Sequence, residues 1–576
     1  MPNWIIKNKG AQVHAPKGMD PAIYAILRER GIAEAAMPDF LSERPRTTYD
    51  PMLMPDMKKT VDRLILASQR DEKICIYGDY DADGVTSTAL LTQVLKLFCK
   101  HVGYYVPSRF VDGYGLNMEA VRILRERGAE LIVTVDCGST SPAEVAYAKE
   151  LGMDVIVTDH HTPDTARTPD CLFINPKREG SVYPFQELSG CGVVFKLAQA
   201  LQRKLSEKDP DIFPKSRLSS LTDLVAISSV ADVVPLVDEN RTLVKYGLEY
   251  INMRTRPGLR VLLEHLECAD TQIDSDRIAY LLAPNINALG RMDSALSGVE
   301  LFCGIAADGG PSRSYDVLAE IMLQSNAARK AEQEKTHTIC MKAMRSEDCG
   351  EYFPIIRAPG AHEGVAGIVA GNLKEQLHRP VCIVTPSDDG MLKGTGRSVP
   401  GISLYELLAG KQELFERFGG HDGACGFSMK EENLPELRSS MQQRVKELLE
   451  EDPGVLTENI IIEKELAPSE MNVEFAEQLR LLEPYGEGNP RPLFCVMNAK
   501  AAGLRHMGAE SRHLRFTALA EENSSIGCVL FRRADEYYEL LDSGCRIDVA
   551  GELGINEFGG SRRLQMIVRD IREHVQ

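Results

Sequence analysis

The chain is poor in aromatic residues and has no closely spaced pair of cysteines. Aromatic residues make up 6% of the 576 residues, tryptophan occurs once, and none of the 14 cysteines belongs to a C-x-x-C pair. This spacing argues against a structural zinc site and is typical of reduced, buried thiols in a cytoplasm. No apolar run reaches the length that spans a bilayer, and no signal peptide is visible. We therefore expect a cytoplasmic protein without membrane contact.

Positive charge is also scarce. The chain has 66 lysines and arginines against 84 aspartates and glutamates, a formal net charge of −18. This balance alone argues against nucleic-acid binding, because phosphate contacts need lysine and arginine. A binding path needs only a local basic stripe, however, and bound metal ions would offset part of the acidic charge. For any single basic cluster, ordinary surface charge accounts for the residues equally well. The clusters are Arg254, Arg256 and Arg260; Arg505, His506, Arg512, His513 and Arg515; Arg532 and Arg533; and Arg562 and Arg563.

Carboxylate and imidazole side chains follow short apolar runs at several places. Runs of the kind that form strands lie at 74–77, 131–135 and 155–158, and a further apolar run precedes residue 232. Ligands of open parallel sheets bind at the carboxyl ends of the strands, so we expect these side chains to converge on one crevice. Oxygen-rich sites with one or two imidazoles suit Mn²⁺ or Mg²⁺, and paired ions are common in phosphodiester hydrolysis. The candidates are Asp79, Asp81, Asp83, Asp136, His160, His161 and Asp232.

The acidic segment 79–84, taken alone, also fits a calcium loop or a solvated turn. It resembles the start of an EF-hand calcium loop, but that loop needs a glutamate at its twelfth position, where this chain has Leu90. A calcium loop also needs a preceding helix, whereas residues 74–77 are typical of a strand. A solvated acidic turn would account for any one cluster, but not for three clusters at strand ends with an adjacent histidine pair.

The order of strand and helix patterns predicts an α/β protein of several domains. Residues 1–50 form an N-terminal cap. Residues 51–250 alternate short strands with helices, which indicates a parallel sheet covered on both faces, and Thr86 and Ser87 open the helix after the acidic cluster. Residues 251–348 form a helical connector that ends in one long helix from Ser312 onward, able to link two domains across a cleft.

Residues 349–576 show two successive secondary-structure patterns. Residues 349–455 return to an α/β pattern. Residues 456–576 contain five or six short strands separated by turns, which predicts a small β-barrel. An OB-fold is the natural form of such a barrel, because it would supply a platform for a single nucleic-acid strand.

Four blocks of residues resemble the motifs of the DHH phosphoesterase superfamily, and they are most similar to the RecJ-type single-strand-specific exonucleases. The resemblance runs in order from about residue 70 to about residue 430. It implies a parallel-sheet DHH domain and a smaller α/β DHH-associated domain joined by a long helix, with an OB-fold at the C-terminus. The four blocks are Tyr77–Gly84, Asp136, Asp159–His161 and Ser229–Asp232, and later blocks are the connector-like Asn287–Met292 and the second-domain segments His362–Ala370, Gly394–Ser398 and Gly419–His421.

The resemblance implies a site for two Mn²⁺ or Mg²⁺ ions. Asp136 is the best candidate for a shared ligand, because its strand should lie between those that precede Asp81 and His160. Two ions about 3.5–4 Å apart need such a carboxylate. Asp159 would orient its neighbour, and His161 would contact the scissile phosphate or assist proton transfer. The implied metal ligands are Asp79, Asp81, Asp83, Asp136, His160 and Asp232, and the implied catalytic residues are Asp136, Asp159, His160 and His161.

By the same resemblance, the DHH-associated domain recognises the terminal nucleotide of the substrate through its 5′ phosphate. One departure from the family pattern is Ala361, which stands where the family usually has a tryptophan, so a stacking contact from that position is in doubt. The implied phosphate-binding residues are Arg291, His362, Gly364, Arg397, Ser398 and His421, and the expected DNA-binding residues of the barrel are Arg505, Arg512, Arg515, Arg532 and Arg533.

The implied function is a metal-dependent 5′→3′ exonuclease that degrades single-stranded DNA to mononucleotides in DNA repair and recombination. The family implies a single-strand binding protein and a helicase as partners, and we expect a monomer. One alternative is a small-substrate phosphoesterase acting on oligoribonucleotides, cyclic dinucleotides or pyrophosphate, but such relatives are shorter and lack the barrel. A second alternative is an inactive replication or repair scaffold, which would be expected to lose motif carboxylates that this chain retains.

Overall fold

The computed structural model describes residues 2–7, 14–108, 115–387, 390–508, 510–520, 524–558 and 561–575. The chain divides into two compact units. The larger unit comprises residues 4–283, 299–315 and 460–576, and the smaller unit comprises the remainder. Within the described ranges, no helix is long and apolar enough to cross a membrane, and no disulfide bond joins the cysteines.

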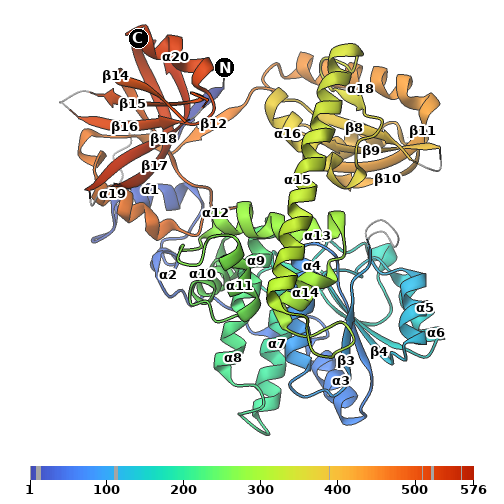
Figure 1. Cartoon of the computed structure of the whole chain (residues 1–576). Helices are drawn as coiled ribbons and strands as arrows, with labels where there is room; N and C mark the ends of the chain where they lie inside the picture. The colour runs from blue at the N-terminus through green and yellow to red at the C-terminus, as the bar shows by residue number, and fades with distance from the viewer. Residues whose placement is uncertain are drawn as a thin grey trace. The chain divides into compact units, whose positions relative to one another are not determined.

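A five-stranded parallel sheet forms the first part of the larger unit. Its strands are β2 (Ile74–Tyr77), β3 (Val102–Tyr105), β4 (Leu131–Val135), β5 (Asp154–Thr158) and β6 (Leu172–Ile174), and the helices around it are α3 (Met57–Gln69), α4 (Ala82–Leu95), α5 (Met118–Glu126), α6 (Pro142–Glu150) and α7 (Gly190–Ser206). The strand order is β3-β2-β4-β5-β6. β2 and β4 are buried along their whole length, because α5 and α6 pack on one face and α4 and α7 contact the other (Figure 1). The predicted covered parallel sheet is confirmed.

Helices follow the sheet along the chain. They are α8 (Lys215–Ser220), α9 (Thr222–Ala231), α10 (Asp238–Asn252), α11 (Pro257–His265), α12 (Ser275–Arg277), α13 (Ala283–Met292), α14 (Leu296–Cys303) and α15 (Tyr315–Ser346), with a π-helical turn at Ile278–Leu282. The predicted long helix is α15. It begins at Tyr315 rather than Ser312, because the guanidinium of Arg313 is held by Glu300 at 2.7 Å in an extended segment before the helix.

The smaller unit contains a mixed five-stranded sheet with the order β10-β11-β9-β8-β7. Its strands are β7 (Ile355–Arg357), β8 (Val381–Pro386), β9 (Met391–Arg397), β10 (Phe415–His421) and β11 (Ala424–Lys430), and its helices are α16 (Glu363–Leu377), α17 (Leu404–Ala409) and α18 (Leu434–Glu451). β7, β8 and α16 agree with the α/β pattern predicted for residues 349–455. β9, β10 and β11 form an antiparallel extension that the sequence pattern did not reveal.

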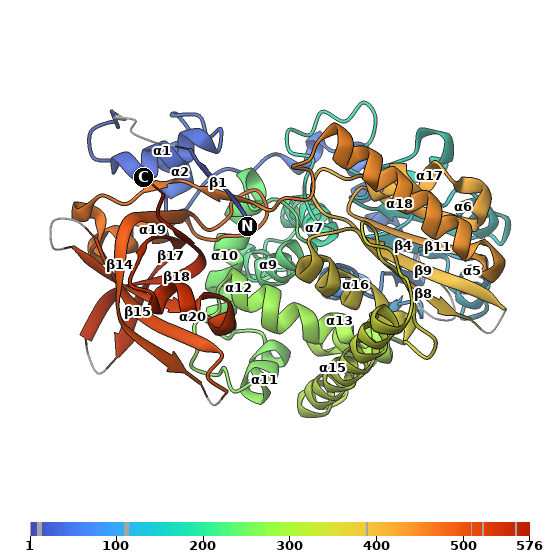
Figure 2. The same cartoon turned by 90° about the horizontal axis from the view of Figure 1, so that it is seen from above.

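The C-terminal strands form a closed barrel. They are β14 (Leu493–Met507), β15 (His513–Leu519), β16 (Ser525–Leu530), β17 (Arg546–Phe558) and β18 (Ser561–Glu573), with α19 (Val473–Leu479) before them and α20 (Ala534–Asp542) between β16 and β17. The order is β14-β15-β16-β18-β17, and pairing of β14 with β17 closes the barrel. This five-stranded order with a helix after the third strand is that of an OB-fold, which confirms the prediction. α20 packs against β14 and β15 (Figure 2).

The N-terminal segment packs against this barrel. Its elements are β1 (Asn3–Ile6), α1 (Pro21–Glu29) and α2 (Met37–Leu41), and it pairs with β12 (Asn459–Ile462), which precedes the short β13 (Lys464–Glu465). Ile26 and Leu27 of α1 are fully buried in the same hydrophobic core as Phe494 and Phe516 of the barrel. The indole of Trp4 donates a hydrogen bond of 2.7 Å to Asp570.

Candidate functional site

Asp81 joins β2 to α4. It is the N-cap residue of α4, and its side chain accepts a hydrogen bond from the amide of Gly84 at 3.0 Å. Aspartate is favoured at this position because it satisfies an amide that has no partner inside the helix. Thr86 and Ser87, which we expected to open the helix, lie within α4 instead. A strand in front and a helix that starts at residue 82 also exclude the calcium loop.

Asp83 lies in the first turn of α4 and is buried. Its Oδ2 atom accepts a hydrogen bond of 2.7 Å from the amide of Gly190. Its Oδ1 atom accepts hydrogen bonds of 2.7 Å from the amide of Cys191 and from the hydroxyl of Ser228. The carboxylate is therefore held by the N-terminus of α7 and by α9, and its orientation is fixed from two elements distant in sequence.

Asp136 follows β4 directly. Its backbone is left-handed, with φ at +60°, and its amide donates to the carbonyl of Thr158 at 3.0 Å. The side chain is buried. β4 lies between β2 and β5 in the sheet, as a metal ligand shared between their ends requires. Few residues other than glycine tolerate this backbone, and aspartate is among those that do.

Asp159 organises the histidine pair after β5. Its Oδ1 atom accepts hydrogen bonds from the amides of His160 and His161, at 2.7 and 3.1 Å, and lies 2.8 Å from Nδ1 of His161. Its Oδ2 atom accepts from the amide of Ser139. These contacts engage both oxygens of Asp159, so its side chain supports the loop that presents the two imidazoles.

Asp232 does not follow a strand. The apolar run before it is helix α9, and Asp232 is the C-cap residue of that helix. The expectation of a strand end here is wrong, because a short apolar run without alternation fits a buried helix as well as a buried strand. The position still brings the carboxylate to the crevice.

The carboxylates of Asp83, Asp136 and Asp232 converge on the imidazole of His160. Its Nε2 atom lies 3.1 Å from Oδ1 of Asp136, 3.5 Å from Oδ2 of Asp232 and 3.8 Å from Oδ2 of Asp83. Potential metal-ligand atoms form three groups, and within each group these atoms all lie within 4.8 Å of one another. The groups are Asp136, His160 and His161; Asp83, His160 and Asp232; and Asp79, Asp81 and Asp136.

Burial and the crowding of negative charge raise the pKa values of three carboxylates in the cluster. Burial raises the pKa of Asp136 well above its usual value, and the charges of Asp83 and Asp81 raise it further. Burial and the charge of Asp83 likewise raise the pKa of Asp81, and they raise the pKa of Asp232 to about 8. A bound cation would favour the ionised forms of the same carboxylates.

The pKa values of the two imidazoles, His160 and His161, are shifted in opposite directions. Burial lowers the pKa of His160. Burial also opposes the charged form of His161, but the hydrogen bond with Asp159 outweighs it and raises the pKa of His161 to about 9. Burial would raise the pKa of Asp159, but hydrogen bonding to His161 lowers it below its usual value. Asp159 and His161 therefore form an ion pair beside the cluster.

The residues fit a divalent metal site. Oδ1 of Asp136 and both ring nitrogens of His160 are buried and have no hydrogen-bond partner within the described ranges. Leaving a buried polar atom without a partner costs about 1–3 kcal/mol, and coordination of a cation would remove that cost. Carboxylate oxygens with an imidazole nitrogen are a donor set that Mn²⁺ and Mg²⁺ accept.

The predicted phosphate-binding residues Arg291, His362 and Gly364 meet in the smaller unit. His362 is the N-cap residue of α16, and its Nδ1 accepts a hydrogen bond from the amide of Gly364 at 3.0 Å. The guanidinium of Arg291 donates to the carbonyl of Gly364 at 2.9 Å. A phosphate could contact the amide of Gly364 only if the hydrogen bond to His362 opened. Ala361, in place of the family tryptophan, packs at the edge of the hydrophobic core.

Arg397 and His421 lie in one row across the sheet of the smaller unit. Both are directly paired with Ala424 of β11, the strand between β10 and β9, so their side chains share one face. Ser398 is buried, and its hydroxyl donates to the carbonyl of Ile402 at 2.7 Å. The geometry therefore brings Arg397 and His421 together and gives Ser398 a contact inside the fold.

The five predicted DNA-binding arginines of the barrel differ in their local contacts. Arg505 and Arg515 are paired across β14 and β15. Arg512 pairs with Glu510 at 2.8 Å, and Arg533 pairs with Glu536 at 2.6 Å. Arg532 lies just after β16 with a left-handed backbone. Of the five, Arg515 lines a pocket on the barrel.

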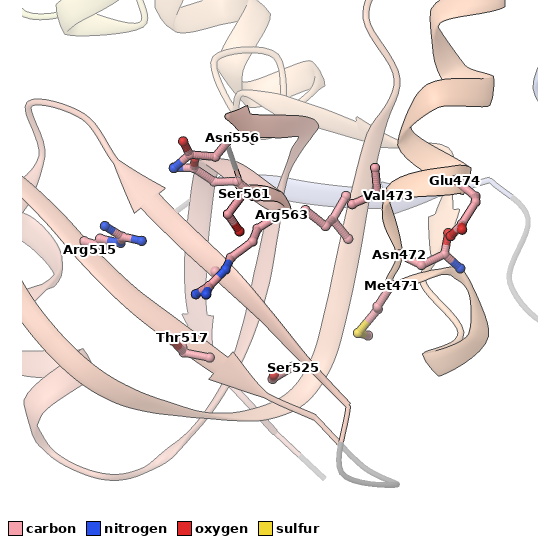
Figure 3. A pocket seen from close by; sticks show the side chains of 13 residues that line it. Met471, Asn472, Val473, Glu474, Arg515, Thr517, Ser525, Asn556, Ser561 and Arg563 are labelled. Atoms are coloured by element: carbon pink, nitrogen blue, oxygen red, sulfur yellow. The ribbon is translucent and has the colours of Figure 1, made fainter. Parts of the chain in front are cut away.

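This pocket has a volume of about 940 Å³ and is lined by residues of β15, β16, β17 and β18, by the start of α19 and by the segment before it. Figure 3 shows Arg563 near its centre, with Arg515 and Thr517 on one side and Met471 and Asn472 on the other. None of the lining residues is aromatic. We did not predict Arg563 as a binding residue, although the Arg562–Arg563 pair at the start of a strand was a signal for it.

Family models match three parts of the chain. The DHH family, N-terminal domain, matches residues 73–228; the DHHA1 domain matches residues 351–447; and the RecJ OB domain matches residues 462–570. The first match contains the β2, β4 and β5 ends of the cluster, and the third contains the barrel pocket.

Relatives match almost the whole chain. The single-stranded-DNA-specific exonuclease RecJ of Escherichia coli K12 is 36% identical over 575 residues, which is 96% of each chain. The RecJ of Bacillus subtilis 168 is 34% identical over 98% of this chain and 69% of its own length. The crystal structure of RecJ in complex with Mn²⁺ from Thermus thermophilus matches with a TM-score of 0.81 at 28% identity, covering 100% of this chain and 80% of that one. The chain belongs to the RecJ family.

Proposed function

We propose that this chain is a metal-dependent exonuclease that degrades single-stranded DNA from its 5′ end to mononucleotides, in DNA repair and recombination. The observation that carries the proposal is the converging set of Asp83, Asp136, His160 and Asp232. The set lies in a chain that aligns over nearly its whole length with single-stranded-DNA-specific exonucleases.

The cluster would carry out phosphodiester hydrolysis. Two Mn²⁺ or Mg²⁺ ions bound there would generate a water nucleophile and stabilise the leaving oxygen. Asp136 would be the shared ligand, because its strand lies between the other two. Asp159 fixes the ring of His161 through Nδ1, and the side chain of His161 is 43% exposed, so a substrate phosphate can reach it. The remaining ligands would be Asp79, Asp81, Asp83, His160 and Asp232.

The smaller unit would bind the terminal phosphate of the strand. Arg397 and His421 share one face of the sheet, and guanidinium matches phosphate oxygens with two hydrogen bonds. His362 at the start of α16 and Arg291 at the end of α13 would add contacts. These assignments rest on the family motifs and on the proximity of the side chains within the unit.

The barrel would hold the strand farther from its end. Arg515 and Arg563 line the pocket on the β15, β16 and β18 face, which is the face that OB-folds use for oligonucleotides. Because no aromatic side chain lines the pocket, we infer that it grips the sugar-phosphate backbone rather than stacking on bases. Such binding would be sequence-independent and sensitive to salt.

We further infer that the chain acts as a monomer in the cytoplasm, together with a single-strand binding protein and a helicase. A hydrolase that takes only unpaired strands needs a partner that unwinds duplexes, and cysteines without disulfides suit a reducing compartment. The molar mass of the purified chain, measured by light scattering, tests whether it is a monomer. Capture of the chain by an immobilised single-strand binding protein tests the partner.

The direct test of the proposed function uses strands labelled at either end. Single-stranded DNA, blunt duplex DNA and RNA are each incubated with Mn²⁺, Mg²⁺ or EDTA. We expect a 5′ label on single-stranded DNA to appear at once as a mononucleotide with Mn²⁺, and no release in EDTA. Earlier release of a 3′ label would overturn the polarity. Hydrolysis restricted to dinucleotides would favour the small-substrate phosphoesterase.

A further inference from the structure

The N-terminus of α7 lies directly against the carboxylate cluster. Ser189 is its N-cap residue, and Gly190 and Cys191 begin the helix. Amides in the first turn of a helix have no partner inside it, and the positive end of the helix dipole favours a negative charge there. Here the amides of Gly190 and Cys191 each donate a 2.7 Å hydrogen bond to a different oxygen of Asp83.

The two oxygens of Asp83 are used unequally. Oδ1 accepts from Cys191, from Ser228 at 2.7 Å and from Ser87 at 3.1 Å. Oδ2 accepts from Gly190 and lies 3.8 Å from Nε2 of His160. Oδ2 accepts one hydrogen bond against the three of Oδ1, so Oδ2 keeps acceptor capacity that can face His160. The N-terminus of α7 therefore fixes the orientation of the Asp83 carboxylate, so that one oxygen faces the cluster.

Gly190 also sets the space available to Asp136. A Cβ atom placed on Gly190 would lie 2.7 Å from both Cβ and Oδ1 of Asp136. This is closer than side chains approach one another, and Asp136 cannot retreat freely because its amide is hydrogen-bonded to the carbonyl of Thr158 at the end of β5. Any residue other than glycine at position 190 would displace the shared carboxylate.

We propose that Gly190 is a positioning residue of the metal cluster: its amide orients Asp83, and its missing side chain makes room for Asp136. Ser228 supports the same arrangement from α9, since its hydroxyl lies 2.7 Å from Asp83 and 2.6 Å from that of Ser189, the cap of α7. The inference rests on the proposed function, because it concerns how this cluster holds metal ions.

The test compares Mn²⁺ binding to the full chain by calorimetry and electron paramagnetic resonance. The variants are Gly190→Ala, Ser228→Ala and the control Gly192→Ala. The control adds the same methyl group in the same helix, where its nearest neighbours are side-chain atoms of Leu188 and Ser189 at 3.3 Å or more. Circular dichroism and thermal unfolding in EDTA show whether each variant folds.

We expect Gly190→Ala to bind Mn²⁺ at least about tenfold more weakly, as is typical when support of a ligand is lost. Ser228→Ala should show a smaller loss, and Gly192→Ala should match the wild type. A folded Gly190→Ala variant with wild-type affinity would overturn the inference. If Gly190→Ala does not fold, Ser228→Ala decides: weaker binding supports the inference, and unchanged binding overturns it. Absence of Mn²⁺ binding by the wild type would instead overturn the proposed metal site, and the inference with it.

Discussion

The carboxylate cluster and the barrel pocket hold their charged groups in opposite ways. In the cluster, backbone amides and hydroxyls fix buried side chains, and Asp83 alone accepts four hydrogen bonds. In the pocket, Arg515 and Arg563 are exposed and form no ion pair with the described residues. A fixed set of ligands suits chemistry that needs defined geometry, whereas mobile cations suit a flexible strand. We therefore predict that the two sites can be disabled separately.

Loss of the shared ligand should have the largest effect. We expect Asp136→Ala to reduce the rate of nucleotide release by about 1,000-fold or more, because metal activation of water supplies much of the barrier reduction. Its affinity for single-stranded DNA should be kept, since the barrel is untouched. Rates are measured at saturating Mn²⁺, with the exposed Asp170→Ala as control. Activity within tenfold of the wild type would remove Asp136 from the centre of the site.

Blunt duplex DNA should be a much poorer substrate than a single strand. Asp83 and Asp136 are buried, so the scissile phosphate of a paired strand reaches them only after several base pairs open, each step costing roughly 1.4 kcal/mol. Opening two or three pairs predicts a rate about 100-fold to 1,000-fold lower. Initial rates on the same labelled strand, alone and in duplex, measure the difference. Equal rates would mean that the cluster accepts paired ends.

Loss of the pocket arginines should weaken binding and leave chemistry intact. We expect Arg515→Ala/Arg563→Ala to lower the affinity for single-stranded DNA about tenfold and to reduce the slope of log K against log salt by about 2, while kcat is kept. The matched control is Arg512→Ala/Arg533→Ala, which removes two arginines already paired with glutamates. If the control weakens binding as much as the test variant, the strand does not follow the pocket.

The smallest effect should appear at the terminal-phosphate site. Arg397→Ala should raise KM for strands with a 5′ phosphate about tenfold, the loss of a hydrogen bond to a charged group. KM for 5′-hydroxyl strands should change little, because they lack that charge. Steady-state kinetics on the two kinds of strand give the ratio. Equal impairment on both would assign Arg397 to the fold of β9 rather than to the phosphate.

The cluster could be predicted from sequence because its parts lie at the ends of strongly apolar strands. β2, β4 and β5 are β-branched runs, and parallel topology forces their carboxyl ends together. Asp232 was expected after a strand and lies after a helix, since the buried run 224–229 has no periodicity that separates the two. The backbone donors to Asp83 could not be predicted, because an amide has no signature in the sequence.

The strands of the smaller unit and the binding residues of the barrel were harder to predict from the sequence, for different reasons. β9, β10 and β11 contain glycines such as Gly394, Gly396 and Gly419, which are weak strand formers, so their sheet forms through tertiary pairing. In the barrel, the pattern of short strands was predicted, but which arginines share a face depends on register and on local ion pairs. Arg512 and Arg533 are engaged by glutamates nearby in sequence, and Arg563, which was not among the predicted binding residues, lines the pocket.

The most direct test of the metal centre is anomalous diffraction from crystals of the full chain grown with Mn²⁺. We predict two Mn²⁺ peaks about 3.5–4 Å apart, both bound by Asp136, with Asp81, Asp83, His160 and Asp232 completing the ligands. A single peak, or two peaks without a shared carboxylate from Asp136, would contradict the two-metal site on which the proposed hydrolysis depends.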